Sequence, residues 1–130
     1  MKTAKQLKIS NGVYEALIKV FGMLDAGEIP EKGFNMALWL ETNGRGKTTC
    51  GCIGGWAESC GEIIALGDSP FGLINLCFPS REKVRGGGSW NYSTITREQG
   101  ARALENYLNT GKAKWTSILA PKTWKNDEDC

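Results

Sequence analysis

The side chains best suited to covalent or metal chemistry in this chain are its cysteines, because the sequence contains no histidine. The five cysteines are Cys50, Cys52, Cys60, Cys77 and Cys130. Without an imidazole, Ser-His-Asp and Cys-His catalysis are impossible within the chain. A thiol enzyme would need a helix N-terminus, or Arg45 and Lys47, to lower the pKa of Cys50, Cys52 or Cys60. We therefore expect no catalytic residue and keep a thiol-dependent enzyme as the least favoured alternative.

The cysteine spacing matches no common metal site. Cys50 and Cys52 form a C-x-C pair, whereas ordinary zinc sites use C-x-x-C. Adding Cys60 and Cys77 leaves a four-thiolate structural zinc as an alternative. An odd number of cysteines without a recognisable signal peptide favours reduced thiols in the cytoplasm. We expect free thiols that are buried as small apolar side chains, with no metal and no cofactor.

A glycine-rich stretch resembles the end of a phosphate-binding P-loop. It reads Gly44-Arg45-Gly46-Lys47-Thr48 and contains the G-K-[ST] triplet. The first glycine of that motif is replaced by Glu41, and nothing upstream indicates the preceding parallel strand. NTP hydrolysis is therefore disfavoured. We expect a solvated turn over Thr42–Lys47, with Arg45 and Lys47 as the candidate anion-binding residues.

The strongest candidate binding segment combines basic residues, a triple glycine and two aromatic rings. Its candidate partner-binding residues are Arg81, Lys83, Arg85, Trp90 and Tyr92. Such a loop suits an acidic protein surface, or phosphates with stacked bases. A solvated loop without a ligand is the plain alternative.

The overall charge favours a protein partner over a polyanion. Sixteen basic and fourteen acidic residues give a formal charge of only +2. This balance predicts neither nucleic-acid nor anionic-membrane binding. We expect a host protein complex as the partner, with nucleic acid or a nucleotide as the alternative and no membrane.

Two long helices are predicted from apolar spacing and capping residues. One runs from Ser10 or Asn11 to Ala26, with Gly27 as the residue that ends it. The other begins after Thr96, where Thr96-Arg97-Glu98-Gln99 forms a capping box, and ends at Gly111.

Two shorter helices are predicted between them. Asn35 caps the first, over Phe34–Glu41, which must be held by packing because isolated helices of this length are unstable. The second covers Phe71–Phe78, with Ser69 at the N-cap and Pro70 at the first helical position.

The stretch Thr49–Leu66 also has helical spacing, with a strand over Thr48–Ile53 as the alternative. Glycines in the interior of a helix are unfavourable. Those at Gly54, Gly55 and Gly61 therefore indicate close approach of another backbone or of a bulky ring such as Trp39. Glu58 and Glu62 lie one turn apart and are expected on a solvated face.

The length of 130 residues predicts one domain. We expect a mainly α, compact bundle of four or five helices with long glycine-rich loops at 42–47 and 79–93. Residues 1–9 and 125–130 are expected to be frayed. No apolar run is long enough to span a membrane. Most tryptophans are expected in the core, and the C-terminal tail, with Trp115 and Trp124, is expected to pack back onto the bundle.

Several motifs resemble those of small, mostly uncharacterised phage and bacterial proteins. The resembling segments are Phe34-Asn35-Met36-Ala37-Leu38-Trp39, Thr49–Ala57, Leu76-Cys77-Phe78, Thr96–Ala101 and Thr110-Gly111. Asn35 replaces the usual aspartate, and Lys47 falls where the pattern has its first cysteine. The resemblance implies a phage or bacterial origin and a helical fold, and it implies no reaction.

These observations together predict a non-enzymatic protein-binding module of phage or mobile-element type that acts in the cytoplasm. An inhibitor of a bacterial defence complex, similar to an anti-CRISPR protein, fits the size and the lack of catalytic equipment. The alternative is a nucleic-acid or nucleotide-binding protein that uses the loop over residues 81–92.

Overall fold

The computed structural model describes residues 1–45, 47–60, 69–79 and 92–119. Within these ranges the chain forms six α-helices and one two-stranded antiparallel sheet, so the mainly α prediction is confirmed. Two short 3-10 helices, η1 (Glu31–Gly33) and η5 (Tyr92–Thr94), complete the described elements. None of the helices in the described ranges combines the length and apolar character that crossing a membrane requires.

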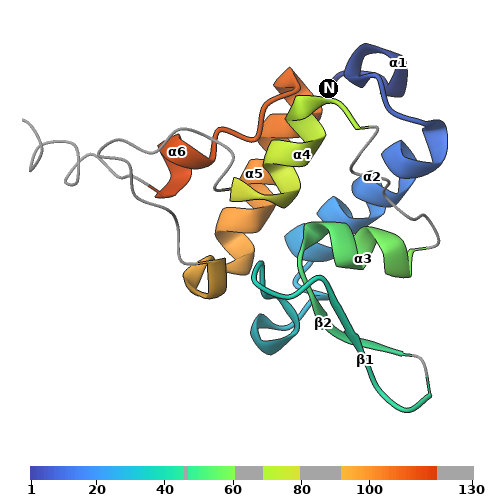
Figure 1. The fold of residues 1–130 in the computed structure, drawn as a ribbon, viewed down its shortest axis with the longest axis vertical. Coiled ribbons are helices and arrows are strands. Elements are labelled where there is room, and N and C mark those ends of the chain that lie inside the picture. Colours follow the sequence, from blue (N-terminus) through green and yellow to red (C-terminus); the bar gives the residue numbers. More distant parts are fainter. Residues whose placement is uncertain (46, 61–68, 80–91, 120–130) are drawn as a thin grey trace, which may run out of the picture.

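The helices α2 (Asn11–Asp25) and α5 (Arg97–Thr110) pack against each other (Figure 1) and begin where the sequence predicts. The Ser10 side chain accepts a hydrogen bond from the Val13 N–H at 3.1 Å. Thr96 and Gln99 form the predicted capping box, with backbone-to-side-chain distances of 2.9 and 3.1 Å. Local caps and apolar periodicity agree here, which explains the success of the prediction.

The chain also forms a short first helix, α1 (Ala4–Leu7), where fraying was expected. Thr3 and Gln6 build a second capping box, and the Lys2 N–H donates to the Leu108 carbonyl at 2.7 Å. The prediction of frayed residues 1–9 is therefore wrong. These tertiary contacts hold a helix that would be too short to persist alone.

Two further helices cover α5. They are α4 (Phe71–Cys77) and α6 (Trp115–Leu119). Pro70, and not Ser69 as predicted, is the N-cap of α4, and α4 has no side-chain cap hydrogen bond. The indole N–H of Trp115 donates to the Leu76 carbonyl at 3.2 Å and so ties α6 to α4.

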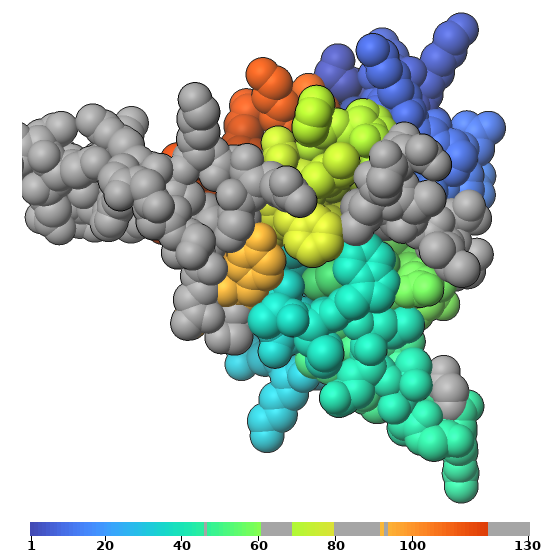
Figure 2. All heavy atoms as spheres, in the orientation of Figure 1, coloured from blue at the N-terminus to red at the C-terminus, as the bar shows by residue number. Residues whose placement is uncertain are grey.

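A β-hairpin forms where the sequence predicts the end of one helix and the start of the next. The strands β1 (Leu40–Thr42) and β2 (Thr48–Gly51) pair antiparallel and project from the body of the molecule (Figure 2). The predicted helix over Phe34–Glu41 is wrong: the Asn35 side chain accepts from the Ala37 N–H at 2.9 Å and forms a turn instead of a helix cap.

The predicted helix over Thr49–Leu66 is wrong at its start, and the alternative strand is correct for Thr48–Gly51. The helix α3 begins only at Ile53 and extends to Ser59, and residues 61–68 lie outside the described ranges. Cys52 is the N-cap of α3, and its Sγ accepts from the Gly55 N–H at 3.5 Å. In a helix that began at Thr49, the backbone C=O groups of Thr49–Gly51 would bond within the helix. In the structure, pairing of β2 with β1 satisfies backbone groups of this segment instead.

The hairpin is joined to α3 through Trp39. A Cβ atom on Gly54 would overlap the Trp39 ring, and one on Gly55 would overlap the Trp39 carbonyl. The Cys52 N–H donates to the Leu38 carbonyl at 2.8 Å at the same place. The predicted approach of Trp39 to these glycines is therefore confirmed.

The core lies between α2, α3, α4 and α5 and includes two of the tryptophans. Trp56 and Trp115 are buried, as predicted, and the Trp56 indole N–H donates to the Gly33 carbonyl at 2.8 Å. Trp39 is half-buried and packs against this core. Trp90 and Trp124 lie outside the described residues.

Gly55→Ala should destabilise the fold by about 3 kcal/mol, because the new methyl group must displace a backbone carbonyl. Gly22→Ala is the matched control, since nothing lies within 4 Å of a Cβ at that exposed helical position. It should stabilise the fold by about 0.5–1 kcal/mol. Urea unfolding of both variants measures the difference, and equal stabilities would contradict the close packing of Trp39 on α3.

Candidate functional site

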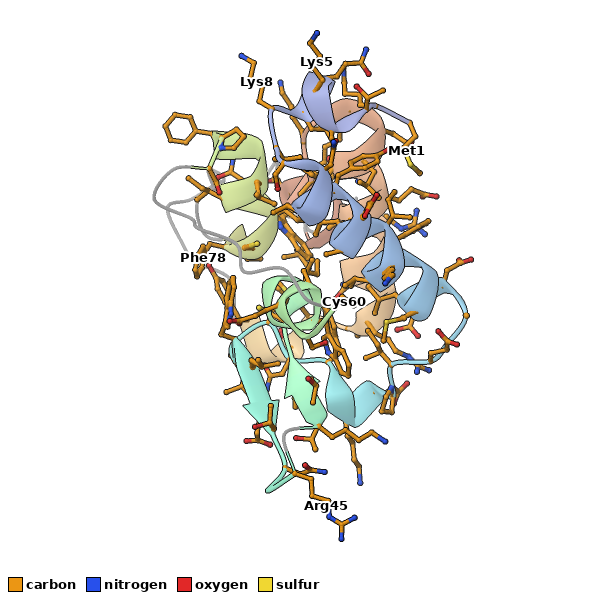
Figure 3. The ribbon with its side chains drawn as sticks, turned by 90° about the vertical axis from the view of Figure 1, so that its right-hand side faces the viewer. Met1, Lys5, Lys8, Arg45, Cys60 and Phe78 are labelled. Atoms are coloured by element: carbon orange, nitrogen blue, oxygen red, sulfur yellow. The ribbon has the colours of Figure 1, made fainter. Side chains whose placement is uncertain are left out.

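The predicted anion-binding residues Arg45 and Lys47 are both exposed and belong to the link between β1 and β2. Arg45 lies at the tip of the hairpin (Figure 3). The Asn43 Oδ1 accepts from the Arg45 N–H at 2.8 Å and from the Lys47 N–H at 3.0 Å. These two amides are thus already bonded within the turn. Arg45 and Lys47 therefore offer an anion their side-chain charges and not the backbone amides that a P-loop uses.

The predicted partner-binding segment is only partly described. Arg81, Lys83, Arg85 and Trp90 lie outside the described residues. Tyr92 lies in η5, is half-buried and packs against the hydrophobic core. Tyr92 therefore has a role in packing beside any role in binding.

Cys50 and Cys52 do not have the lowered pKa that a thiol enzyme needs. Burial is the main cause that raises the pKa of Cys52. Burial, together with the nearby Glu41 carboxylate, also raises the pKa of Cys50. Cys52 and Cys77 are buried, as predicted, whereas Cys50 and Cys60 are half-buried. A raised thiol pKa leaves less nucleophilic thiolate at neutral pH.

The structure also does not assemble the alternative zinc site. Among the residues that it describes, no three cysteine, aspartate or glutamate side chains form a group that could hold a metal ion. Cys50, Cys52, Cys60 and Cys77 are all described, so these four thiols are not brought together as a ligand set.

Glu58 has a partner that the sequence did not indicate. Its Oε2 accepts a hydrogen bond of 2.7 Å from the Trp39 indole N–H. The prediction of a solvated face is therefore wrong for Glu58, and Glu62 lies outside the described residues. Trp39 lies over Gly54, so its N–H reaches the residue one turn further along α3.

An apolar pocket that the sequence analysis missed lies at the start of α4, at the end of the molecule away from the hairpin (Figure 1). Phe71, the first residue of α4, is 83% exposed. It lines a pocket of about 360 Å³ whose wall is mainly apolar. The other lining residues are Gly72, Asn75, Gly111, Lys112, Ala113 and Lys114. A ring this exposed beside an apolar pocket is a candidate anchor for a partner, because buried aromatic side chains supply much of the energy of protein interfaces.

Two lysines, Lys112 and Lys114, line this pocket, and three more belong to the neighbouring N-terminal segment. We call the surface formed by Phe71 and by Lys2, Lys5, Lys8, Lys112 and Lys114 the basic end. The two lysine-bearing segments are adjacent, because Leu7 faces Gly111 and the Lys2 N–H donates to the Leu108 carbonyl. Met1, Lys5 and Lys8 lie at the end of the molecule opposite Arg45 (Figure 3). The segments 1–14, 71–79 and 106–119 contain no aspartate or glutamate, so the charge of the basic end is uncompensated within them.

Two of these lysines have an unusual backbone conformation. Lys8 and Lys114 have φ values of 60° and 59°, and no other non-glycine residue in the described ranges has a positive φ. Glycine adopts this conformation freely, whereas a residue with a Cβ pays about 1 kcal/mol or more. Backbone strain of this kind gathers at functional sites. Both strained positions belong to the basic end.

The sequence contains signals that point to the basic end in retrospect. Lys2, Lys5 and Lys8 recur every third residue around the capping box of α1. In α4 the buried stripe is Leu73, Leu76 and Cys77. Phe71 lies on the opposite side of the helix from this stripe, because each residue turns the helix by 100°.

The comparisons with known proteins add no relative: no family model, no curated protein and no solved structure matches the chain.

Alkylation of Cys50 at pH 7 should be slower in the folded chain than in the urea-unfolded chain, because its raised pKa lowers the thiolate fraction. The pH at which the rate is half-maximal should lie above about 8.5, the pKa of an unstructured cysteine. Residue-resolved mass spectrometry after brief treatment with iodoacetamide measures this. A rate that levels off below pH 8 would revive the thiol-enzyme alternative.

Lys114→Gly should stabilise the fold by up to about 1 kcal/mol, since glycine relieves the positive φ. Lys112→Gly removes the same charge at a position without positive φ and should destabilise by about 0.5–1 kcal/mol. Thermal unfolding measures both variants, and a loss of stability in Lys114→Gly would show that the side chain supports the fold.

Proposed function

We propose that the chain is a non-enzymatic protein-binding module that binds an acidic surface of a larger complex through the basic end. The observation that carries the proposal is the exposed Phe71 ring beside an apolar pocket that Lys112 and Lys114 also line. A buried aromatic anchor with a charged rim is the usual arrangement of a protein interface.

The two components of the surface have different tasks. Full burial of a phenylalanine side chain contributes about 1.5–3 kcal/mol, so Phe71 supplies affinity. The lysines accelerate the encounter with an acidic partner and disfavour basic ones. Since Lys5, Lys8, Lys112 and Lys114 are exposed, a partner can reach them without rearrangement of the helices.

The partner in this proposal is a host complex, such as a bacterial defence complex inhibited by a phage-encoded or mobile-element protein in the cytoplasm. The resemblance of the motifs around Trp39 and Trp56 to small phage and bacterial proteins supports this part of the proposal. The scaffold within the proposal is a compact single-domain bundle of helices.

Phe71→Ala should reduce retention of the partner by about 30-fold, the effect of losing an interface anchor worth about 2 kcal/mol. Lys112→Glu should also reduce it, because the substitution reverses a charge beside the pocket. Lys32→Glu is the charge-matched control, because Lys32 is exposed but belongs to η1 and not to the basic end. Quantitative mass spectrometry of proteins captured from a bacterial lysate on the tagged full chain measures retention.

Unfolding curves of Phe71→Ala, Lys112→Glu and Lys32→Glu should coincide with that of the unchanged chain, since all three side chains are exposed. The proposal would be overturned if Phe71→Ala retained the captured protein as well as the unchanged chain does. Capture that nuclease treatment abolishes would instead favour the nucleic-acid alternative.

A further inference from the structure

The structure indicates the chemistry of the partner segment that the basic end binds. We infer that this segment is an acidic stretch of polypeptide with one large apolar side chain, which occupies the pocket beside Phe71 while carboxylates on either side contact Lys8, Lys112 and Lys114. The inference rests on the proposed function and specifies the chemistry of its partner.

The pocket fits a single apolar side chain. Its volume of about 360 Å³ lies at the small end of the range of about 300–1,000 Å³ for ligand sites. The Phe71 ring and Gly72 contribute apolar surface, and Asn75 adds an amide that can bond to a peptide backbone. A Cβ on Gly72 would overlap the Gly111 carbonyl, so α4 contacts the backbone of the α5–α6 link directly at the base of the pocket.

The charges around the pocket are of one chemical kind. The segments 1–14 and 106–119 contain five lysines, and neither they nor the segment 71–79 contain an arginine. Arginine is the usual residue for bidentate recognition of phosphates and for stacking on bases, whereas a lysine ammonium is a compact point charge. Phe71 is the only large aromatic residue exposed in the described ranges, so the basic end lacks the row of stacking rings typical of single-strand binders. A polypeptide with carboxylates therefore fits better than a nucleic acid.

The backbone fixes where the carboxylates must lie. Lys8 follows α1 with φ of 60°, and its N–H bonds to the carbonyls of Ala4 and Lys5. Lys114 precedes α6 with φ of 59°. Leu7, which precedes Lys8, faces Gly111 in the wall of the pocket. Lys8 and the pair Lys112 and Lys114 are thus held on two adjacent segments at the pocket, where carboxylates next to the apolar residue can reach both.

Fluorescence anisotropy with the full chain and labelled synthetic peptides tests this inference. The main probe is a short Gly/Ser peptide in which a central leucine has two aspartates on each side. One control peptide replaces the leucine by glycine, and another replaces the aspartates by asparagine. An oligothymidine serves as the competing polyanion.

The leucine peptide should bind, and each control peptide should bind at least about tenfold more weakly, since each lacks one of the two contact types. Phe71→Ala should abolish the preference for leucine over glycine, and the double variant Lys112→Glu/Lys114→Glu should abolish the preference for aspartate. Lys32→Glu should change neither. The leucine peptide should shift the backbone amide NMR signals of Gly72, Gly111 and Ala113 in the full chain.

Equal binding of the leucine and glycine peptides would overturn the inference, because the surface would then act by charge alone. Oligothymidine that displaces the labelled leucine peptide at a lower concentration than the unlabelled leucine peptide does would also overturn the inference, in favour of nucleic acid. If captured proteins depend on Phe71 and Lys112 but no acidic peptide binds, the partner chemistry fails while the proposed function stands. If the peptides bind as expected but no captured protein depends on Phe71, the proposed function fails alone.

Discussion

The contact of Trp39 with two glycines of α3 determines the arrangement of the central part of the chain. Because Gly54 and Gly55 have no side chain, the indole ring and the carbonyl of Trp39 lie directly on the helix. The indole N–H is then bonded to Glu58, and the ring stacks near Phe78 with centroids 6.4 Å apart. Trp39 therefore connects the hairpin, α3 and the end of α4, and the position of α4 in turn places Phe71 at its other end.

The parts of the fold that the sequence predicted are those in which local signals agree. In α2 and α5, caps, apolar spacing and terminal glycines all indicate the same bounds. The hairpin was missed because the residues around Trp39 and Cys52 have helical apolar spacing, while their structure depends on pairing between strands. Gly54 and Gly55 were informative for a different reason: an unfavourable residue in a helix requires a neighbour that explains it.

The candidate site was less predictable than the fold. Periodicity identifies Leu73, Leu76 and Cys77 as core, but it does not show whether another element covers Phe71 on the opposite face. The lysines of the basic end come from two segments about a hundred residues apart in the sequence, and only the contacts of α1 with Leu108 and Gly111 bring them together. The positive φ of Lys8 and Lys114 has no sequence signature, because glycine would be the expected residue at both positions.

The lysines around Phe71 also have a consequence for solubility. A phenylalanine ring that is 83% exposed on an otherwise neutral surface would promote self-association of the chain. Two copies that approached each other through this surface would bring the lysines of the basic end together, and these like charges repel. The lysine ammonium groups are therefore expected to oppose aggregation of the chain through the Phe71 ring.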